Sequence, residues 1–101
     1  MSAYLIVNYT VDDAEAYGQY QQGAGPALKV GSECKVLVLD PASEQVEGEG
    51  AGHQTVVLEF ESMERAKEIY HSGEYQAVLP TRLGATSKHF AVLVNGFEMP
   101  G

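Results

Sequence analysis

The chain has 101 residues, which is room for one domain with one hydrophobic core, expected to span residues 1–101. Acidic residues outnumber basic ones by 14 to 6, and the formal net charge is −8. The basic residues are scattered, whereas nucleic acids and anionic membranes need clustered lysine and arginine, so neither is an expected partner. Cys34 is the only cysteine and allows no intrachain disulfide. The apolar run near the N-terminus is too short for a signal peptide or a membrane span, and we expect a cytoplasmic protein.

A strand and a helix are predicted first along the chain. Residues 3–9 (Ala-Tyr-Leu-Ile-Val-Asn-Tyr) are β-branched and aromatic, as is typical of a strand. Asp12 can then cap a helix, with Glu15 reaching back to it from three residues later. Residues at spacings of three and four form one stripe of that helix: Ala14, Tyr17, Tyr20 or Gln21, and Ala24. Nearby glycines and Pro26 weaken the helix end, so a break or a second turn is expected over residues 27–30.

Two strands joined by a long excursion are predicted next. Residues 33–39 and 54–61 are short apolar runs of strand length. The stretch between them, residues 40–53, is rich in Gly, Glu, Ser and Pro and predicts an exposed hairpin, with residues 45–47 briefly extended. Its glycines stand at alternate positions: Gly48, Gly50 and Gly52. No strand–turn–helix surrounds them, so they do not form a dinucleotide-binding fingerprint.

The last third of the chain predicts helices followed by a strand. Ser62 caps a helix whose inner face is apolar: Met63, Ala66, Ile69 and Tyr70. Ser72 is expected to start a further helical piece over residues 73–79, which Pro80 interrupts. Residues 88–95 form the fourth strand, and residues 96–101 a tail.

This order, β-α-β-β-α-β, predicts an α+β ferredoxin-like fold with one antiparallel sheet and the helices on one face. The first strand is expected in the middle of the sheet and the last strand at an edge. A sheet with one face in water should alternate apolar and polar residues. Here every strand carries an apolar run that covers both faces, such as residues 5–7 and 91–94. Leaving about six such side chains exposed to water would lose on the order of 10 kcal/mol of stabilisation from apolar burial. We therefore expect a homodimer in which a second copy covers the open sheet face.

Several segments resemble a known bacterial family. They are residues 3–7, 16–20, 47–48, 57–62, 70–76 and 80–82. The most specific is the series Glu-Phe, then Tyr-x-Ser-x-x-Tyr, then Arg, running from Glu59 to Arg82. In order and spacing these segments resemble the family called domain of unknown function 1330, over nearly the whole chain.

The resemblance implies a dimeric α+β barrel, in which two ferredoxin-like sheets pair face to face. Proteins of that superfamily include cofactor-independent monooxygenases, lactone isomerases, haem-degrading enzymes and chlorite dismutases, while this family has no established activity. Typical members have an Arg-Gly-Gly stretch after the second strand and an arginine pair before the third. Here residues 38–40 (Val-Leu-Asp) and 53–54 (His-Gln) stand in those places. Any anion site formed by those arginines is therefore lost or rebuilt in this chain.

Glu59, Arg82 and His53 are the candidate catalytic residues. Glu59 lies amid apolar strand residues, where a carboxyl group would have a raised pKa suited to acid–base catalysis. Arg82, the partner that the resemblance suggests, would instead hold it ionised in a bidentate pair, and a purely structural ion pair is the competing interpretation. His53 replaces a family arginine, and could assist acid–base chemistry or meet an anion when protonated; a plain loop histidine is the alternative.

Five further residues are candidates for ligand binding: Tyr17, Tyr20, Tyr70, Ser72 and Tyr75. The tyrosines come from two helices that should cover the same sheet face, so they could line a small pocket or form an aromatic core. Ser72 has no neighbouring base at readable spacing and can equally be a helix cap. The three histidines show no metal-ligand spacing, and no metal or cofactor is expected.

Three functions remain open at this point. The first is an uncharacterised small-molecule-binding homodimer with monooxygenase-like or isomerase-like activity. The second is a non-catalytic ligand-binding module, and the third is a structural or assembly dimer. An unfilled pocket of a few hundred cubic ångströms containing Glu59 or Arg82 would favour the first two. A solidly packed interior would favour the third.

Overall fold

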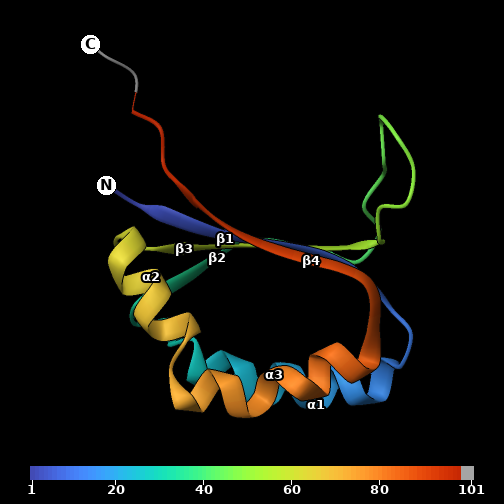
Figure 1. Cartoon of the computed structure of the whole chain (residues 1–101), viewed down its shortest axis with the longest axis horizontal. Coiled ribbons are helices and arrows are strands. Elements are labelled where there is room, and N and C mark those ends of the chain that lie inside the picture. Colours follow the sequence, from blue (N-terminus) through green and yellow to red (C-terminus); the bar gives the residue numbers. More distant parts are fainter. Residues whose placement is uncertain (99–101) are drawn as a thin grey trace.

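The computed structural model describes residues 1–98. Its elements, in chain order, are β1 (Ala3–Val11), α1 (Ala14–Ala27), β2 (Cys34–Asp40), β3 (Gln54–Phe60), α2 (Met63–Tyr70), α3 (Gly73–Ala85) and β4 (Thr86–Asn95). The four strands form one antiparallel sheet in the order β2-β3-β1-β4, and the helices lie on one side of it (Figure 1). The predicted ferredoxin-like α+β fold is confirmed, with β1 in the middle and β4 at an edge.

The start of α1 differs from the prediction. Asp13, not Asp12, is the N-cap, and its side chain accepts from the Ala16 N–H at 3.1 Å. The N–H groups of Asp12 and Asp13 both donate to the Ala85 carbonyl, at 2.8 and 3.1 Å, which ties the start of α1 to the end of α3. The helix runs through Pro26, ends at Ala27 and is followed by a turn at residues 28–29, within the range where a break or a second turn was expected.

Helix α3 is longer than predicted. Ser72 caps it, accepting from the Tyr75 N–H at 3.3 Å, but the helix continues past Pro80 to Ala85. Pro80 lies on the exposed side, where water can satisfy the carbonyl that loses its partner. The opposite side of α3 buries Tyr75 and Arg82, so packing holds the helix together across the proline.

The hairpin between β2 and β3 (residues 41–53) carries no strand at 45–47, contrary to the expectation. Its base is tied to β1 by two hydrogen bonds: Asn8 Nδ2 donates to the Gly52 carbonyl at 3.1 Å, and the Gly52 N–H donates to Asn8 Oδ1 at 2.7 Å. At the far end of the chain, the tail predicted over residues 96–101 is described only as far as residue 98. None of the described helices is long and apolar enough to cross a membrane.

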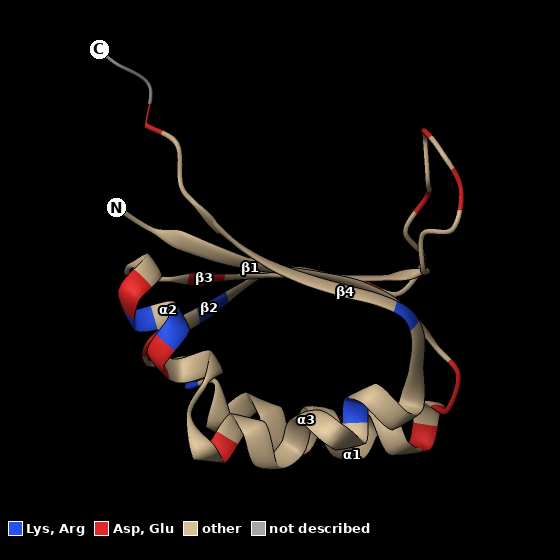
Figure 2. Ribbon diagram, viewed as in Figure 1, with Lys and Arg blue, Asp and Glu red and all other residues tan. Residues whose placement is uncertain are grey.

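The core lies between the sheet and the helices. In β1 and β3 every second side chain is buried, as strand geometry requires when one face is covered. The largest fully buried side chains are Tyr9, Tyr75, Phe60 and Ile69. Charged residues gather on α2, on the hairpin and at the helix ends, whereas β1 and most of β4 are uncharged (Figure 2).

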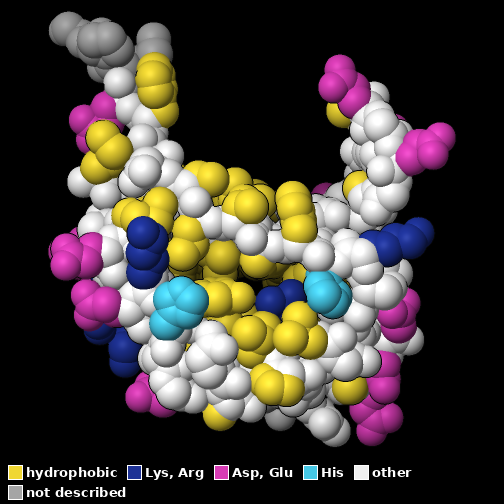
Figure 3. Space-filling model, viewed as in Figure 1, with side chains coloured by type: hydrophobic (Ala, Val, Ile, Leu, Met, Phe, Trp, Pro, Cys, Tyr) yellow, Lys and Arg dark blue, Asp and Glu magenta, His cyan; other side chains and the backbone are white. Residues whose placement is uncertain are grey.

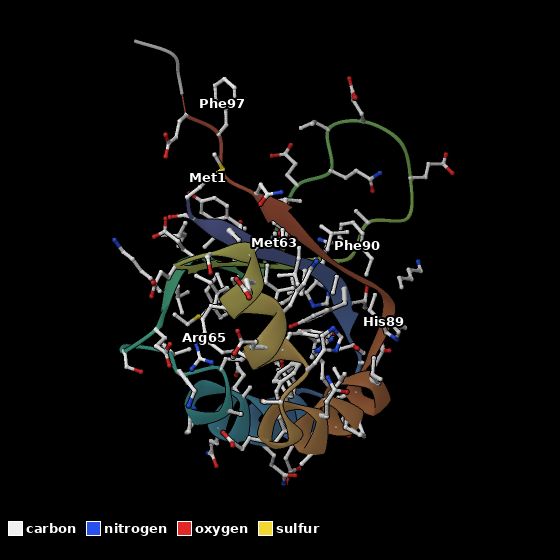
Figure 4. The ribbon with its side chains drawn as sticks, turned by 60° about the vertical axis from the view of Figure 1, so that its left-hand side comes forward. Met1, Met63, Arg65, His89, Phe90 and Phe97 are labelled. Carbon is white, nitrogen blue, oxygen red and sulfur yellow. The ribbon has the colours of Figure 1, made fainter. Side chains whose placement is uncertain are left out.

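The other sheet face carries apolar side chains, and no helix or strand of residues 1–98 covers it. Val38, Phe90, Val92 and Val94 are exposed by 36–53%. The strand register places Ile6 of β1 between Val92 of β4 and Val57 of β3. The hairpin and residues 96–98 rise on this side of the sheet (Figure 1), and Phe97 and Met1 lie there too (Figure 4). The expected two-sided apolar character of the sheet is therefore present.

Candidate ligand-binding chamber

A row of aromatic rings occupies the space between α1, α3 and the sheet. Tyr17 and Tyr20 come from one face of α1, Tyr75 from α3, and Tyr9 from the inner face of β1. Neighbouring rings in the order 9, 17, 20, 75 have centroids 5.6, 5.7 and 6.3 Å apart. Tyr70, the last residue of α2, continues the row at 5.1 Å from Tyr75. We call these five side chains the tyrosine row.

The hydroxyl groups of the row form two short pairs. Tyr9 and Tyr17 share a hydrogen bond of 2.7 Å, and Tyr20 and Tyr75 share another of 2.7 Å. Burial, then the bond to Tyr17, raises the pKa of Tyr9 well above its ordinary value. Burial, then the nearness of Tyr75, does the same to the pKa of Tyr20, and burial raises that of Tyr17. At neutral pH these hydroxyls are therefore uncharged donors and acceptors.

Arg82 lies beside the row and is 3% exposed. Its guanidinium carbon is 5.1 Å from the Tyr9 ring centroid and 5.9 Å from that of Tyr20, within cation–π range. Its Nε has no hydrogen-bond partner among residues 1–98. Arginine stays protonated in proteins, so the interior holds a permanent positive charge.

A pocket of about 200 Å³ opens beside the tyrosine row. Arg82 does not line it directly but lies against Tyr9 and Tyr20, which do. Its wall combines four tyrosines of the row (Tyr9, Tyr17, Tyr20 and Tyr75) with apolar residues from the sheet and α1, among them Leu5, Val7, Ala24, Leu28, Val56 and Leu58. We call this pocket the chamber. Seen from the side of α3 and β4, the molecule is hollowed between sheet and helices, with basic side-chain atoms visible inside (Figure 3). A smaller pocket of about 140 Å³, lined in part by Leu5 and Tyr70, opens on the β4 side.

His53 lies near the mouth of the chamber. It borders a surface depression that shares Tyr17, Gln21 and Leu39 with the chamber. Its Nε2 accepts from the Val11 N–H at 3.4 Å, and the side chain is exposed. The residue is thus placed where it can meet a ligand that enters, and its catalytic role stays a prediction.

The expected pair of Glu59 and Arg82 does not form. Glu59 lies on the open face of the sheet, where its Oε2 accepts from the Tyr4 hydroxyl at 3.2 Å. Arg82 lies on the helix side, and both ion pairs recorded among residues 1–98 involve Arg65 instead. A seven-residue strand sends alternate side chains to opposite faces, and the sequence spacing from Glu59 to Arg82 does not reveal which face each one takes.

Of the predicted ligand-binding residues, Tyr17, Tyr20 and Tyr75 come together at the chamber, and Tyr70 extends the row toward the β4 side. Ser72 is occupied as the N-cap of α3, and its hydroxyl also donates to the Ile69 carbonyl at 2.7 Å. Tyr9 was not among the predicted residues. The strand alternation could have identified it, because Tyr9 is in phase with Leu5 and Val7.

The two other histidines and the single cysteine take no part in the chamber. His71 and His89 are exposed, and residues 1–98 contain no cluster of three or more metal-ligating side chains. Cys34 is buried at the start of β2, and burial raises the pKa of its thiol to about 11.

The fold and the chamber define a ferredoxin-like α+β domain with a tyrosine-lined cavity between one sheet and its helices. The chain belongs to the family described as Domain of unknown function (DUF1330), whose model matches residues 2–97. This confirms the resemblance seen in the sequence. No curated protein matches the chain significantly.

Solved structures share the fold at low sequence identity. A protein of unknown function from Rhodopseudomonas palustris is 16% identical with a TM-score of 0.76, covering 97% of this chain and 84% of that one. A Caulobacter crescentus protein provisionally assigned as an antibiotic biosynthesis monooxygenase is 16% identical with a TM-score of 0.64, covering 96% and 91%. A Bacillus halodurans protein of the ethyl tert-butyl ether d family is 17% identical with a TM-score of 0.52, covering 98% and 100%.

Proposed function

We propose that the protein is a cytoplasmic homodimer that binds a small organic molecule in the chamber. The observation that carries this proposal is the pocket of about 200 Å³ between the sheet and α1, which is partly open to solvent. Ligand sites are concave and mostly apolar with a few polar groups, as this one is. A cavity of roughly 150 Å³ already accommodates benzene, so the chamber is large enough for a single-ring compound. Neither Glu59 nor Arg82 lines the chamber itself, but Arg82 lies against the rings of Tyr9 and Tyr20, which do, and this supports ligand binding over a purely structural or assembly role.

Binding can be tested by titration calorimetry with a panel of single-ring compounds that differ in their polar group. Ala24→Leu fills the chamber, because Ala24 is buried in its wall, whereas Ala77→Leu makes the same change on the exposed side of α3. We expect at least one compound to bind, about tenfold or more weakly to Ala24→Leu, and unchanged to Ala77→Leu. Val56→Phe fills the same space if Ala24→Leu does not fold. A panel with no binding compound, or equal binding to folded filled variants, would refute the proposal.

Catalysis is a second candidate, favoured by the position of His53. Isomerase-like or cofactor-independent monooxygenase-like reactions start by removing a proton from the ligand, which needs a base and a stabiliser of the new anion. No Asp, Glu or His lines the chamber within residues 1–98, and His53 borders the depression at its mouth. The fold shared with the Caulobacter protein is consistent with such a reaction. Turnover that is lost in His53→Gln while binding is retained would support catalysis over binding alone.

The homodimer is supported by the uncovered apolar sheet face. Burying a Val, Ile or Phe side chain contributes roughly 1.5–3 kcal/mol, so a second copy of this face would stabilise the protein substantially. The hairpin and the segment carrying Phe97 rise at opposite ends of the face and could flank that copy (Figure 1).

Two matched substitutions test the homodimer. Val92 and Leu83 are 41% and 42% exposed, but Val92 lies on the open sheet face and Leu83 on α3. Val92→Asp should shift sedimentation equilibrium toward the monomer at micromolar concentration, while Leu83→Asp stays dimeric. A wild-type protein that is monomeric at that concentration would refute the dimer.

A further inference from the structure

Arg82 carries a buried charge that nothing in the described chain neutralises. The residue is only 3% exposed, and its Nε has no hydrogen-bond partner among residues 1–98. A buried ion without a counter-ion is destabilising. The rings of Tyr9 and Tyr20 offset only part of this cost, because cation–π contacts are weaker than a buried, hydrogen-bonded ion pair. No acidic side chain of residues 1–98 forms an ion pair that balances the charge of Arg82.

The tyrosine hydroxyls add to this excess of donors. A neutral tyrosine has one O–H hydrogen, so a pair of hydroxyls has two, and the bond between them uses one. The Tyr9–Tyr17 pair and the Tyr20–Tyr75 pair therefore each keep one O–H hydrogen, for which residues 1–98 offer no recorded acceptor. Burial raises the pKa of Tyr9 and Tyr20, which keeps these hydrogens in place at neutral pH.

We propose that the ligand of the chamber is a small monocarboxylate with a compact apolar body, whose carboxylate accepts from Arg82 and from the paired tyrosine hydroxyls. This inference rests on the proposed function. An ionised carboxylate is an acceptor-only group, which matches a cluster of donors. One buried cation balances one negative charge, so a phosphate dianion would leave charge uncompensated. The apolar wall, with Leu5, Val56 and Leu58, suits a ring or a short alkyl chain.

Three compounds of one shape test the ligand class by calorimetry at neutral pH: benzoate, benzamide and benzylamine. They are an anion, a neutral isostere and a cation. We expect benzoate to bind at least tenfold more tightly than benzamide, as expected for hydrogen bonds to a charged group, and benzylamine to show no binding. Benzamide binding as tightly as benzoate would overturn the inference while leaving the proposed function intact. If none of the three binds and no other single-ring compound does, the proposed function fails as well.

Variants then assign the preference to the named groups. Arg82→Gln should abolish the benzoate preference while benzamide binding is kept. Tyr9→Phe removes one hydroxyl and should weaken benzoate binding several-fold. Tyr4→Phe makes the same change on the same strand but on the opposite sheet face, and should leave binding unchanged. Should Arg82→Gln not fold, the contrast between Tyr9→Phe and Tyr4→Phe decides the matter. A benzoate preference that persists in folded Arg82→Gln, or equal effects of the two tyrosine variants, would overturn the inference.

Discussion

Glu59 and Arg82 lie on opposite faces of the sheet. The carboxylate of Glu59 is next to Tyr4 on the open face, and in the strand register Glu59 stands opposite Lys35 of β2. Arg82 reaches in from α3 on the covered face, against the ring of Tyr9. The sheet separates the two charges, so they lie in different environments.

Glu59→Gln is therefore expected to leave ligand binding in the chamber unchanged within about twofold, since a glutamine carbonyl can still accept from the Tyr4 hydroxyl. Calorimetry on the wild type, Glu59→Gln and Arg82→Gln side by side checks this, with thermal unfolding as the control for folding. A loss of binding in Glu59→Gln as large as that in Arg82→Gln would contradict the separation of the two faces.

Much of the fold could be predicted from the sequence, because β-branched runs and capping serines are local signals. Ser62 and Ser72 do cap α2 and α3. The length of α3 could not be predicted, because the effect of a proline depends on whether it lies on the buried or the exposed side of the helix, and Pro80 is exposed. Tertiary packing overrode the local rule there.

The candidate site was predictable in composition but not in arrangement. Helical spacing placed Tyr17 and Tyr20 on one inner stripe, and the structure brings Tyr75 to them. The partner of Arg82 was not predictable, because sequence order does not tell which sheet face a side chain takes. The chamber's volume is likewise a property of how the two helices stand off from the sheet, which no local pattern encodes.

Glu33 and Arg65 form the clearest pH-dependent contact. Arg65 donates to both carboxylate oxygens of Glu33, at 2.7 and 2.8 Å, and joins α2 to the loop before β2. This bidentate hydrogen bonding holds the pKa of Glu33 below its ordinary value. A lowered pKa in the folded state contributes stability above the unfolded pKa, and that stability is lost as the pH falls through the folded value.

Glu33→Gln should accordingly lower the unfolding temperature at pH 7, and the difference from wild type should shrink toward zero as the pH falls through the lowered folded pKa of Glu33. Glu44→Gln removes the same charge from the exposed hairpin and should show no such trend. Because both partners in the Glu33–Arg65 pair are about one-third exposed, the effect should be small and should weaken at high salt. A difference that grows on acidification would contradict the assigned pair.

Gly52 is the point where the hairpin base touches β1. A Cβ added there would overlap the backbone of Tyr9 and Thr10, so the contact can form only with glycine. Gly52→Ala should destabilise the protein by about 1–3 kcal/mol, as overpacking typically does. Gly18, in α1, has nothing within 4 Å of an added Cβ, and Gly18→Ala should instead stabilise the helix by about 0.5–1 kcal/mol. Urea unfolding measures both, and equal effects of the two would contradict the close approach. Because Gly52 precedes His53 and is bonded to Asn8, Gly52→Ala should also disturb the mouth of the chamber and weaken ligand binding, whereas Gly18→Ala should not.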